Sequence, residues 1–216
     1  MSLKNPPSNK SAATREKIIS AAEQLFAERG VVSVSLADIN RHAGQRNRNA
    51  THYHFGSKEG LIQAILDKHN PGILAQREQM LAPLQLSDTL AARAVVQALM
   101  QPLVDKMFDA NGGREFLCIN AQLMVAHTRD AFRKDRAPAF AIGNNDALTE
   151  ALRKVMHDLP LRLARQRGTL AAVLLVNALA DHSRLMQQEG RNKTNAESKF
   201  MLRALEDALV AILVAP

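Results

Sequence analysis

The chain has 216 residues, a formal net charge of +7 at pH 7, 46% apolar residues and 23% charged residues, which excludes a chain disordered throughout. The single cysteine, Cys118, excludes an intrachain disulfide, and we expect it to be a small buried apolar residue. The longest nearly apolar run, Leu170 to Ala180, is too short to cross a bilayer, and no signal segment opens the chain, so we expect a cytoplasmic protein.

Residues 1–11 are rich in lysine, proline and serine and contain little that could pack. We therefore predict a disordered basic arm. Such an arm is most often an inert tail, and a contact with a phosphate or the minor groove is the alternative.

The first predicted helix covers Thr14 to Glu28, because its apolar residues recur at helical spacing. A cation followed by glycine, Arg29-Gly30, is expected to end it. Ser35 then suits the N-cap of a second helix, with Asp38 three residues on completing an acidic variant of the capping box.

The next stretch, Leu36 to Phe55, predicts a short helix, a tight turn at Gly44 and a second helix whose apolar side is anchored by Tyr53 and Phe55. Between Ile39 and Lys58 there are four Lys or Arg and three His, and no Asp or Glu. A polyanion could approach this face without meeting a carboxylate, and Arg, Asn and Gln are side chains that read base edges. The competing interpretation is an ordinary solvated basic helix pair.

Two sets of candidate DNA contacts follow from this pattern. The first would divide between base edges and nearby phosphates: Gln45, Arg46, Arg48, Asn49 and His52. The second would hold the phosphate backbone: Ser35, Tyr53, His54 and Lys58. Ser35 and Lys58 stand at predicted helix starts, where backbone N–H groups favour an anion.

Five ordered segments carry a resemblance to a known family: Thr14–Ile19, Ala21–Gly30, Ser35–Ile39, Ala43-Gly44 and Tyr53–Ile62. Together they resemble the TetR family of transcriptional regulators. The resemblance implies an N-terminal helix-turn-helix domain, a small-molecule pocket in the second domain, and pairing of the last two helices with those of a twin subunit. One departure lies between Ala43-Gly44 and His54-Phe55, where this chain has nine residues and many relatives have eight, so a longer turn is expected.

The remaining chain is expected to be helical too. A helix from Ser57 to Asn70 should break at Asn70-Pro71-Gly72, which divides the chain into a DNA-binding domain over 12–69 and a second domain over 70–216. The further predicted helices cover 73–82, 87–108, 114–128, 145–158, 161–188 and 196–214. No segment alternates with a period of two, so we predict an all-α protein: a three-helix helix-turn-helix domain followed by a helical bundle for ligand binding and dimerisation.

The last two predicted helices indicate a homodimer. The run from Leu170 to Ala180 is apolar on every side except Asn177, so more than one face must be covered. In the final helix, a stripe of large residues lies beside a stripe of mostly small ones: Leu202, Leu205, Leu209 and Ile212 against Met201, Ala204, Ala208 and Ala211. The alternative is a core made wholly within one chain.

Polar residues on apolar helix faces, together with apolar residues beside them, are candidates for a small-molecule pocket. The set comprises Phe116, Asn120, Leu123, Met124, His127, Asn177 and Asp181. Each has a more ordinary interpretation, since such polar groups usually serve the structure and methionine at helical spacing is usually core. The sequence offers candidates, and the expectation of an effector comes from the resemblance.

The chain carries no recognisable catalytic, metal or cofactor motif, so we expect neither an enzyme nor a cofactor. His52 and His54 alternate on a predicted helix and would point in different directions, which disfavours a metal site. We expect a repressor that binds a palindromic operator as a homodimer and is released by a small molecule. The alternative is an effector-independent DNA-binding dimer whose second domain serves only dimerisation or a protein partner.

Overall fold

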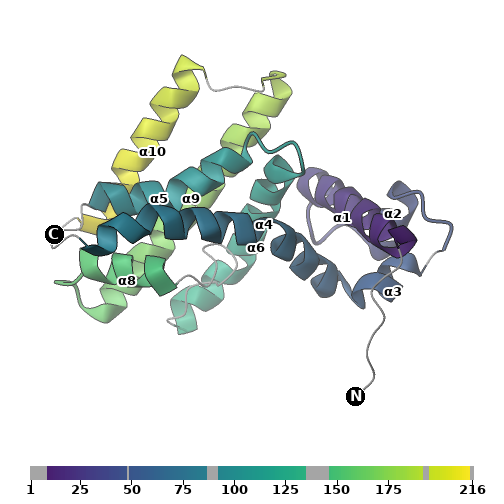
Figure 1. The fold of residues 1–216 in the computed structure, drawn as a ribbon, viewed down its shortest axis with the longest axis horizontal. Helices are drawn as coiled ribbons and strands as arrows, with labels where there is room; N and C mark the ends of the chain where they lie inside the picture. The colour runs from purple at the N-terminus through teal and green to yellow at the C-terminus, as the bar shows by residue number, and fades with distance from the viewer. Residues whose placement is uncertain (1–8, 48, 87–91, 135–145, 192–194, 215–216) are drawn as a thin grey trace. The chain divides into compact units, whose positions relative to one another are not determined.

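The computed structural model describes residues 9–47, 49–86, 92–134, 146–191 and 195–214 (Figure 1). Every regular element among these residues is helical, which confirms the all-α prediction. The chain divides into two compact units, Met1–Lys68 and His69–Pro216. None of the described helices is long and apolar enough to cross a membrane.

The first unit is built from α1 (Asn9–Arg29), α2 (Leu36–His42), α3 (Ala50–Phe55) and the beginning of α4 (Lys58–Leu81). Helix α1 starts at Asn9, so the last three residues of the predicted arm are helical, and residues 1–8 lie outside the described residues. The core of this unit is aliphatic with one aromatic ring: Ile18, Ile19, Leu25, Phe26, Val34, Ile39, Leu61 and Ile65 are all buried.

Local capping positions α2 as the sequence predicts. Gly30 adopts φ 90° after α1, a conformation that glycine enters at little cost. At the start of α2 the Ser35 hydroxyl accepts a hydrogen bond from the Asp38 backbone N–H at 3.2 Å, and the Asp38 carboxylate accepts one from the Ser35 N–H, also at 3.2 Å. The predicted capping box is therefore confirmed.

Helix α4 differs from the prediction, because it continues through Pro71 and Gly72 to Leu81 instead of breaking. An interior proline costs a helix about 3 kcal/mol. On either side of it, Leu66, Ile73 and Leu81 are buried, and such packing contributes more to helix stability than local propensity does. The prediction of a break and of a separate helix over 73–82 was wrong for this reason.

The second unit contains the end of α4, a 3₁₀ helix η1 (Ala82–Leu86) and five further described helices (Figure 1). These are α5 (Ala92–Lys106), α6 (Gly113–Lys134), α8 (Asp146–Val155), α9 (Leu161–Gln188) and α10 (Ala196–Val214). The predicted helices over 161–188 and 196–214 are confirmed, whereas the predicted start of α5 at residue 87 lies outside the described residues. Helix α6 packs along α9, and α10 packs on both α9 and α5.

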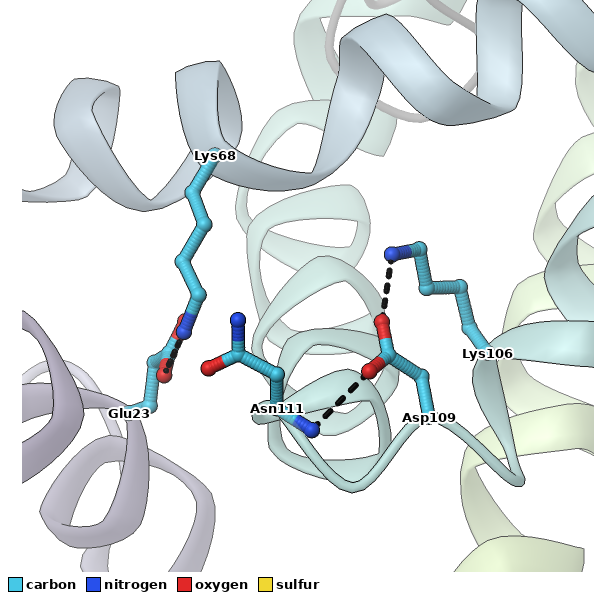
Figure 2. Close-up of polar contacts among 5 residues, drawn as sticks. All are labelled: Glu23, Lys68, Lys106, Asp109 and Asn111. Atoms are coloured by element: carbon cyan, nitrogen blue, oxygen red, sulfur yellow. Dashed lines mark hydrogen bonds and ion pairs between the residues drawn. The ribbon is translucent and has the colours of Figure 1, made fainter.

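Side-chain links hold the second unit together at its ends. Arg114 donates to the backbone carbonyls of Met107 (2.7 Å) and Arg191 (2.9 Å), which ties the start of α6 to the end of α9. Between α5 and α6, the Asp109 carboxylate accepts from Lys106 at 2.7 Å and from the Asn111 N–H at 2.9 Å (Figure 2). Its pKa is lowered, chiefly by the Lys106 hydrogen bond.

Candidate nucleic-acid interface

A buried hydrogen-bonded pair sets the geometry between α2 and α3. The Asn40 side-chain oxygen accepts from the Thr51 backbone N–H at 3.0 Å and from the Thr51 hydroxyl at 2.6 Å. Asn40 is 4% exposed and Thr51 is fully buried. Because buried polar groups are costly when unpaired, this contact fixes α3 against α2. Sequence reasoning missed it, although a polar residue directly after the buried Ile39 was a signal.

The connection between α2 and α3 is long and ordered by its own hydrogen bonds. It runs from Ala43 to Asn49. Gly44 has φ 64°, as its predicted turn role requires, and the next N–H, of Gln45, returns to the Asn40 carbonyl at 2.9 Å. Gln45, Arg46 and Asn49 therefore lie in this connection and not within α3, which agrees with the longer turn expected from the sequence.

The side chains of this region are mostly open to solvent. Arg46, Asn49 and His52 are exposed, while Gln45 is half-buried and its amide donates to the Ala43 carbonyl at 3.1 Å. Arg48 lies outside the described residues. These groups stand in a segment without any carboxylate, so the exposed surface they form is cationic and rich in hydrogen-bond donors.

Helix α3 is anchored differently from the prediction. Tyr53 is 81% exposed, so it does not pack on the apolar side of the helix; Ala50 and Thr51 are the buried residues instead. Phe55 is half-buried, with the Arg15 guanidinium 5.1 Å from its ring centre. The Tyr53 ring lies edge-on to the half-buried His54 ring, with 5.2 Å between centres.

Two candidate phosphate ligands already have partners within the first unit. The Ser35 hydroxyl also donates to the Asp38 carboxylate at 2.5 Å, and this bond is the main reason that the pKa of Asp38 is lowered. The Lys58 ammonium donates to the Val32 carbonyl at 3.2 Å and lies 5.8 Å from the centre of the Phe26 ring. A phosphate at Lys58 would therefore share or replace the bond to Val32.

A buried ion pair joins α1 to α4 inside the same unit (Figure 2). The Lys68 ammonium lies 2.8 and 3.0 Å from the two carboxylate oxygens of Glu23, whose side chain is 2% exposed. Sequence reasoning passed over this pair. The signal was Glu23 itself, a carboxylate set among the apolar residues of the α1 stripe.

The pocket candidates of the second unit fall into two groups. Phe116 and Met124 are fully buried on α6, Asn120 between them is 1% exposed, and Leu123 is half-buried. The Phe116 ring stacks on the His69 ring of α4, with centres 4.6 Å apart and planes at 30°. These residues share one part of the core.

Of the remaining candidates, Asn177 and Asp181 are not part of that buried stripe. Asn177 is half-buried and donates to the Val173 carbonyl at 2.8 Å, one turn back on its own helix. Asp181 is exposed and pairs with Arg184 at 2.5 Å. His127 lies on α6, but its side chain is outside the described residues. Cys118 is buried as predicted, and burial raises the pKa of its thiol.

The last two helices have the two-sided character that the sequence indicated. On α10, Leu205, Leu209 and Leu213 are buried, with Leu213 taking the place expected for the half-buried Ile212. The small residues of the neighbouring stripe, Ala204, Ala208 and Ala211, are exposed. On α9, five leucines remain partly exposed in the chain on its own: Leu161 (63%), Leu163 (37%), Leu170 (49%), Leu174 (37%) and Leu185 (43%).

Two short helices locked by a buried Asn–Thr contact and followed by a supporting helix, with an exposed cationic connection, define a helix-turn-helix DNA-binding protein. Residues 18–65 match the family model described as bacterial regulatory proteins, tetR family. The N-terminal unit is thus a TetR-type DNA-binding domain, and the chain is similar to transcriptional regulators of the TetR family.

The chain is also similar to individual transcriptional regulators. The chain is 50% identical over 54 residues to the HTH-type transcriptional regulator TtgR of Pseudomonas putida, a match that covers 25% of either protein, so about a quarter of that relative's length. It is 27% identical over 158 residues to the HTH-type transcriptional regulator UidR of Escherichia coli, covering 73% of this chain and 69% of UidR. A putative TetR-family regulator from Rhodococcus sp. shares the fold, with a TM-score of 0.52 and 17% identity over 92% of this chain and 99% of that one.

Proposed function

We propose that this protein binds a palindromic DNA operator as a homodimer, represses transcription there, and is released by a small-molecule effector. The observation that carries the DNA-binding part is the exposed, carboxylate-free surface of the α2–α3 connection and α3. Its donors, Arg46, Asn49 and His52, are held on a pair of helices fixed by the Asn40–Thr51 contact. A rigid support is what base-specific contacts require, since their hydrogen bonds tolerate little misplacement.

Within this surface we assign base edges and adjacent phosphates to Arg46, Arg48, Asn49 and His52, with Gln45 as a weaker candidate. Exposed Tyr53 and neighbouring His54 suit the phosphate backbone. We assign Ser35 and Lys58 to the phosphate backbone as well. In the free protein, Ser35 caps α2 and Lys58 donates a hydrogen bond to the Val32 carbonyl.

The first prediction concerns Arg46→Ala. If Arg46 reads a base, we expect operator affinity to fall by about 1–3 kcal/mol with relaxed preference at one position. If it binds a phosphate, affinity should fall for all duplexes alike, and the salt slope should drop by about one. Fluorescence anisotropy on a selected operator and a scrambled duplex, at several salt concentrations, separates the two.

The matched control is Arg162→Ala, which removes an exposed arginine at the start of α9 in the second unit. It lowers the net charge by the same amount and should leave operator affinity nearly unchanged. Unaltered affinity, preference and salt slope in Arg46→Ala would remove Arg46 from the interface.

The homodimer is supported by the exposed alanines of α10 and the exposed leucines of α9. Small residues let a second helix approach closely, and exposed leucines gain from being covered. A twofold dimer presents two equivalent α3 helices, so its operator should consist of two inverted half-sites.

The effector is supported by the buried Phe116, Asn120 and Met124 of α6, and by the continuity of α4 across both units. A molecule that binds one conformation of the second unit better than the other shifts the population, and typical couplings are about 1–3 kcal/mol. Helix α4 would carry this shift, because its first residues belong to the DNA-binding unit and its later residues to the second unit.

The test is operator affinity with and without a compound that raises the melting temperature of the protein in a thermal-shift screen. We expect such a compound to weaken operator binding. Equal affinities for every stabilising compound would leave the effector-independent dimer as the function of the second unit.

A further inference from the structure

We infer that Asn120 recognises a neutral, amide-like group on the effector; this inference rests on the effector site proposed above. Asn120 lies in the middle of the most buried stretch of α6 and is 1% exposed. Neither its side-chain nitrogen nor its side-chain oxygen has a hydrogen-bond partner among the described residues. One side chain thus places an unpaired donor and an unpaired acceptor in the core.

Two other asparagines among the described residues differ from Asn120, because their side chains are hydrogen-bonded. Asn40, similarly buried, accepts two hydrogen bonds from Thr51. Asn177 donates to a carbonyl one turn back on its own helix. Asn120 has neither arrangement, and an unpaired buried amide destabilises the folded state. A side chain that serves the fold would be paired, so the arrangement points to a ligand.

The surroundings of Asn120 define the rest of the ligand. Phe116 lies one turn before it and Met124 one turn after it, so the three side chains share a face of α6. Both neighbours are fully buried, and the Phe116 ring is stacked on His69 of α4. A molecule that reached the Asn120 amide would therefore contact apolar and aromatic surface on either side of it.

The Asn120 side-chain amide determines which polar group on a ligand would fit beside it. A carboxamide or lactam offers an acceptor and a donor side by side, which match the Asn120 nitrogen and oxygen together. A carboxylate offers acceptors only, so it would leave the Asn120 oxygen facing a negative charge. A hydrocarbon would satisfy neither atom. The site thus favours a largely apolar molecule with one neutral amide-like group.

The first test is the stability of Asn120→Leu, which keeps the branching and the number of heavy side-chain atoms but removes both polar ones. We expect the melting temperature of the free protein to rise, by about 2–4 °C. Asn40→Leu is the contrast, because that asparagine is paired; its melting temperature should fall. A lower melting temperature for Asn120→Leu would show that the amide serves the fold, and would overturn the inference.

The second test uses three probes that share one ring: benzamide, benzoate and ethylbenzene. Thermal shifts are measured at equal probe concentration on the unaltered protein and on Asn120→Leu. We expect benzamide to give the largest shift on the unaltered protein, and that advantage to vanish in the variant. A benzoate shift as large as that of benzamide, an advantage that persists in the variant, or no benzamide shift would each contradict the inference.

Operator binding, measured alongside, separates this inference from the proposed function. The unaltered protein should select a duplex and bind it tightly whether or not benzamide binds. If operator binding is present and benzamide fails, only the identity of the ligand group is wrong. If the unaltered protein selects no duplex at all, the proposed function itself fails.

Discussion

At the scale of single residues, one amide oxygen is central to the helix-turn-helix. Asn40 on α2 accepts both the N–H and the hydroxyl of Thr51 on α3, eleven residues later in the chain and out of contact with water. Helix α3 spans only Ala50–Phe55, and a helix this short has little stability of its own. The geometry of the proposed DNA-binding surface thus depends on a buried pair of side chains.

We expect Asn40→Ala to lower the free energy of unfolding by about 1–3 kcal/mol, because it leaves two buried donors of Thr51 without this acceptor. Thr51→Val keeps the backbone bond and should lose less, about 0.5–1.5 kcal/mol. Urea denaturation of both variants measures the difference. Equal stability of Asn40→Ala and the unaltered protein would mean that the pair does not hold α3.

Single residues also differ in how well the sequence predicts their contacts. The Ser35–Asp38 capping box was predictable because its partners are three residues apart and the spacing itself is the signal. For the Asn40–Thr51 pair, the polar residue beside Ile39 was a signal for Asn40 alone, because the path of the chain between Asn40 and Thr51 decides whether they meet. The same path moved Arg46 and Asn49 off the helix and turned Tyr53 outward, and no helical periodicity extends through a turn to reveal it.

At the scale of elements, α4 is the most informative helix. Its local sequence signals a stop at Pro71-Gly72, yet the helix continues to Leu81 because buried residues on both sides favour it. The bounds of α9 and α10 followed from local signals, since Pro160 precedes one helix and Asn195 the other. Local signals thus located the ends of α9 and α10, whereas α4 continues past its stop signal and α6 continues to Lys134, beyond the end predicted at residue 128.

We expect the buried Glu23–Lys68 ion pair to help hold α4 against α1. Removing one partner of a buried ion pair is strongly destabilising, whereas replacing both with apolar residues is often neutral. We therefore expect Lys68→Met to lose about 3–5 kcal/mol of unfolding free energy, and Glu23→Leu with Lys68→Met to recover most of that loss. Chemical denaturation of the two single variants and the double variant measures the coupling, and strictly additive losses would contradict it.

The junction of α9 and α10 contains a buried histidine, His182, so we expect its stability to depend on pH. The buried His182 imidazole lies 3.0 Å from the Ser198 hydroxyl, and its pKa is lowered, chiefly by burial and then by the charge of Arg191. A histidine with a lowered folded-state pKa contributes stability above its unfolded pKa. That contribution is lost as pH falls from the unfolded pKa, about 6.5, through the lower folded pKa.

We therefore expect the melting temperature to drop between about pH 7.5 and pH 5.5, and to drop less in His182→Asn, which cannot take up the proton. Differential scanning calorimetry at the two pH values gives both differences. Identical pH dependence in the two proteins would show that His182 does not titrate against folding in this range.

At the scale of the whole molecule, the second unit presents apolar surface that one chain leaves uncovered. Leucines on α9 and alanines on α10 are exposed, while the opposite faces of the same helices are buried. The sequence predicted this surface from its apolar residues alone, because a helix that is apolar on more than one face needs more than one neighbour. What the sequence of one chain could not supply is the partner, since the proposed contact would lie between chains.

We expect Leu174→Arg to shift the protein from dimer to monomer at micromolar concentration, because it places a charge in the proposed dimer contact. Val125→Arg is the matched control: Val125 is 64% exposed and lies on α6. Size-exclusion chromatography with light scattering distinguishes the two. If the Leu174→Arg protein remained dimeric, Leu174 would not lie in the dimer contact.

The central claim, a dimer that reads a palindrome, is tested most directly by sedimentation equilibrium of the protein on a duplex selected from a random pool. We predict a dimer in the free protein, two inverted half-sites in the selected duplex, and an even number of protomers on each duplex. A monomer at micromolar concentration that binds its selected duplex tightly, one protomer to each duplex, would contradict the claim.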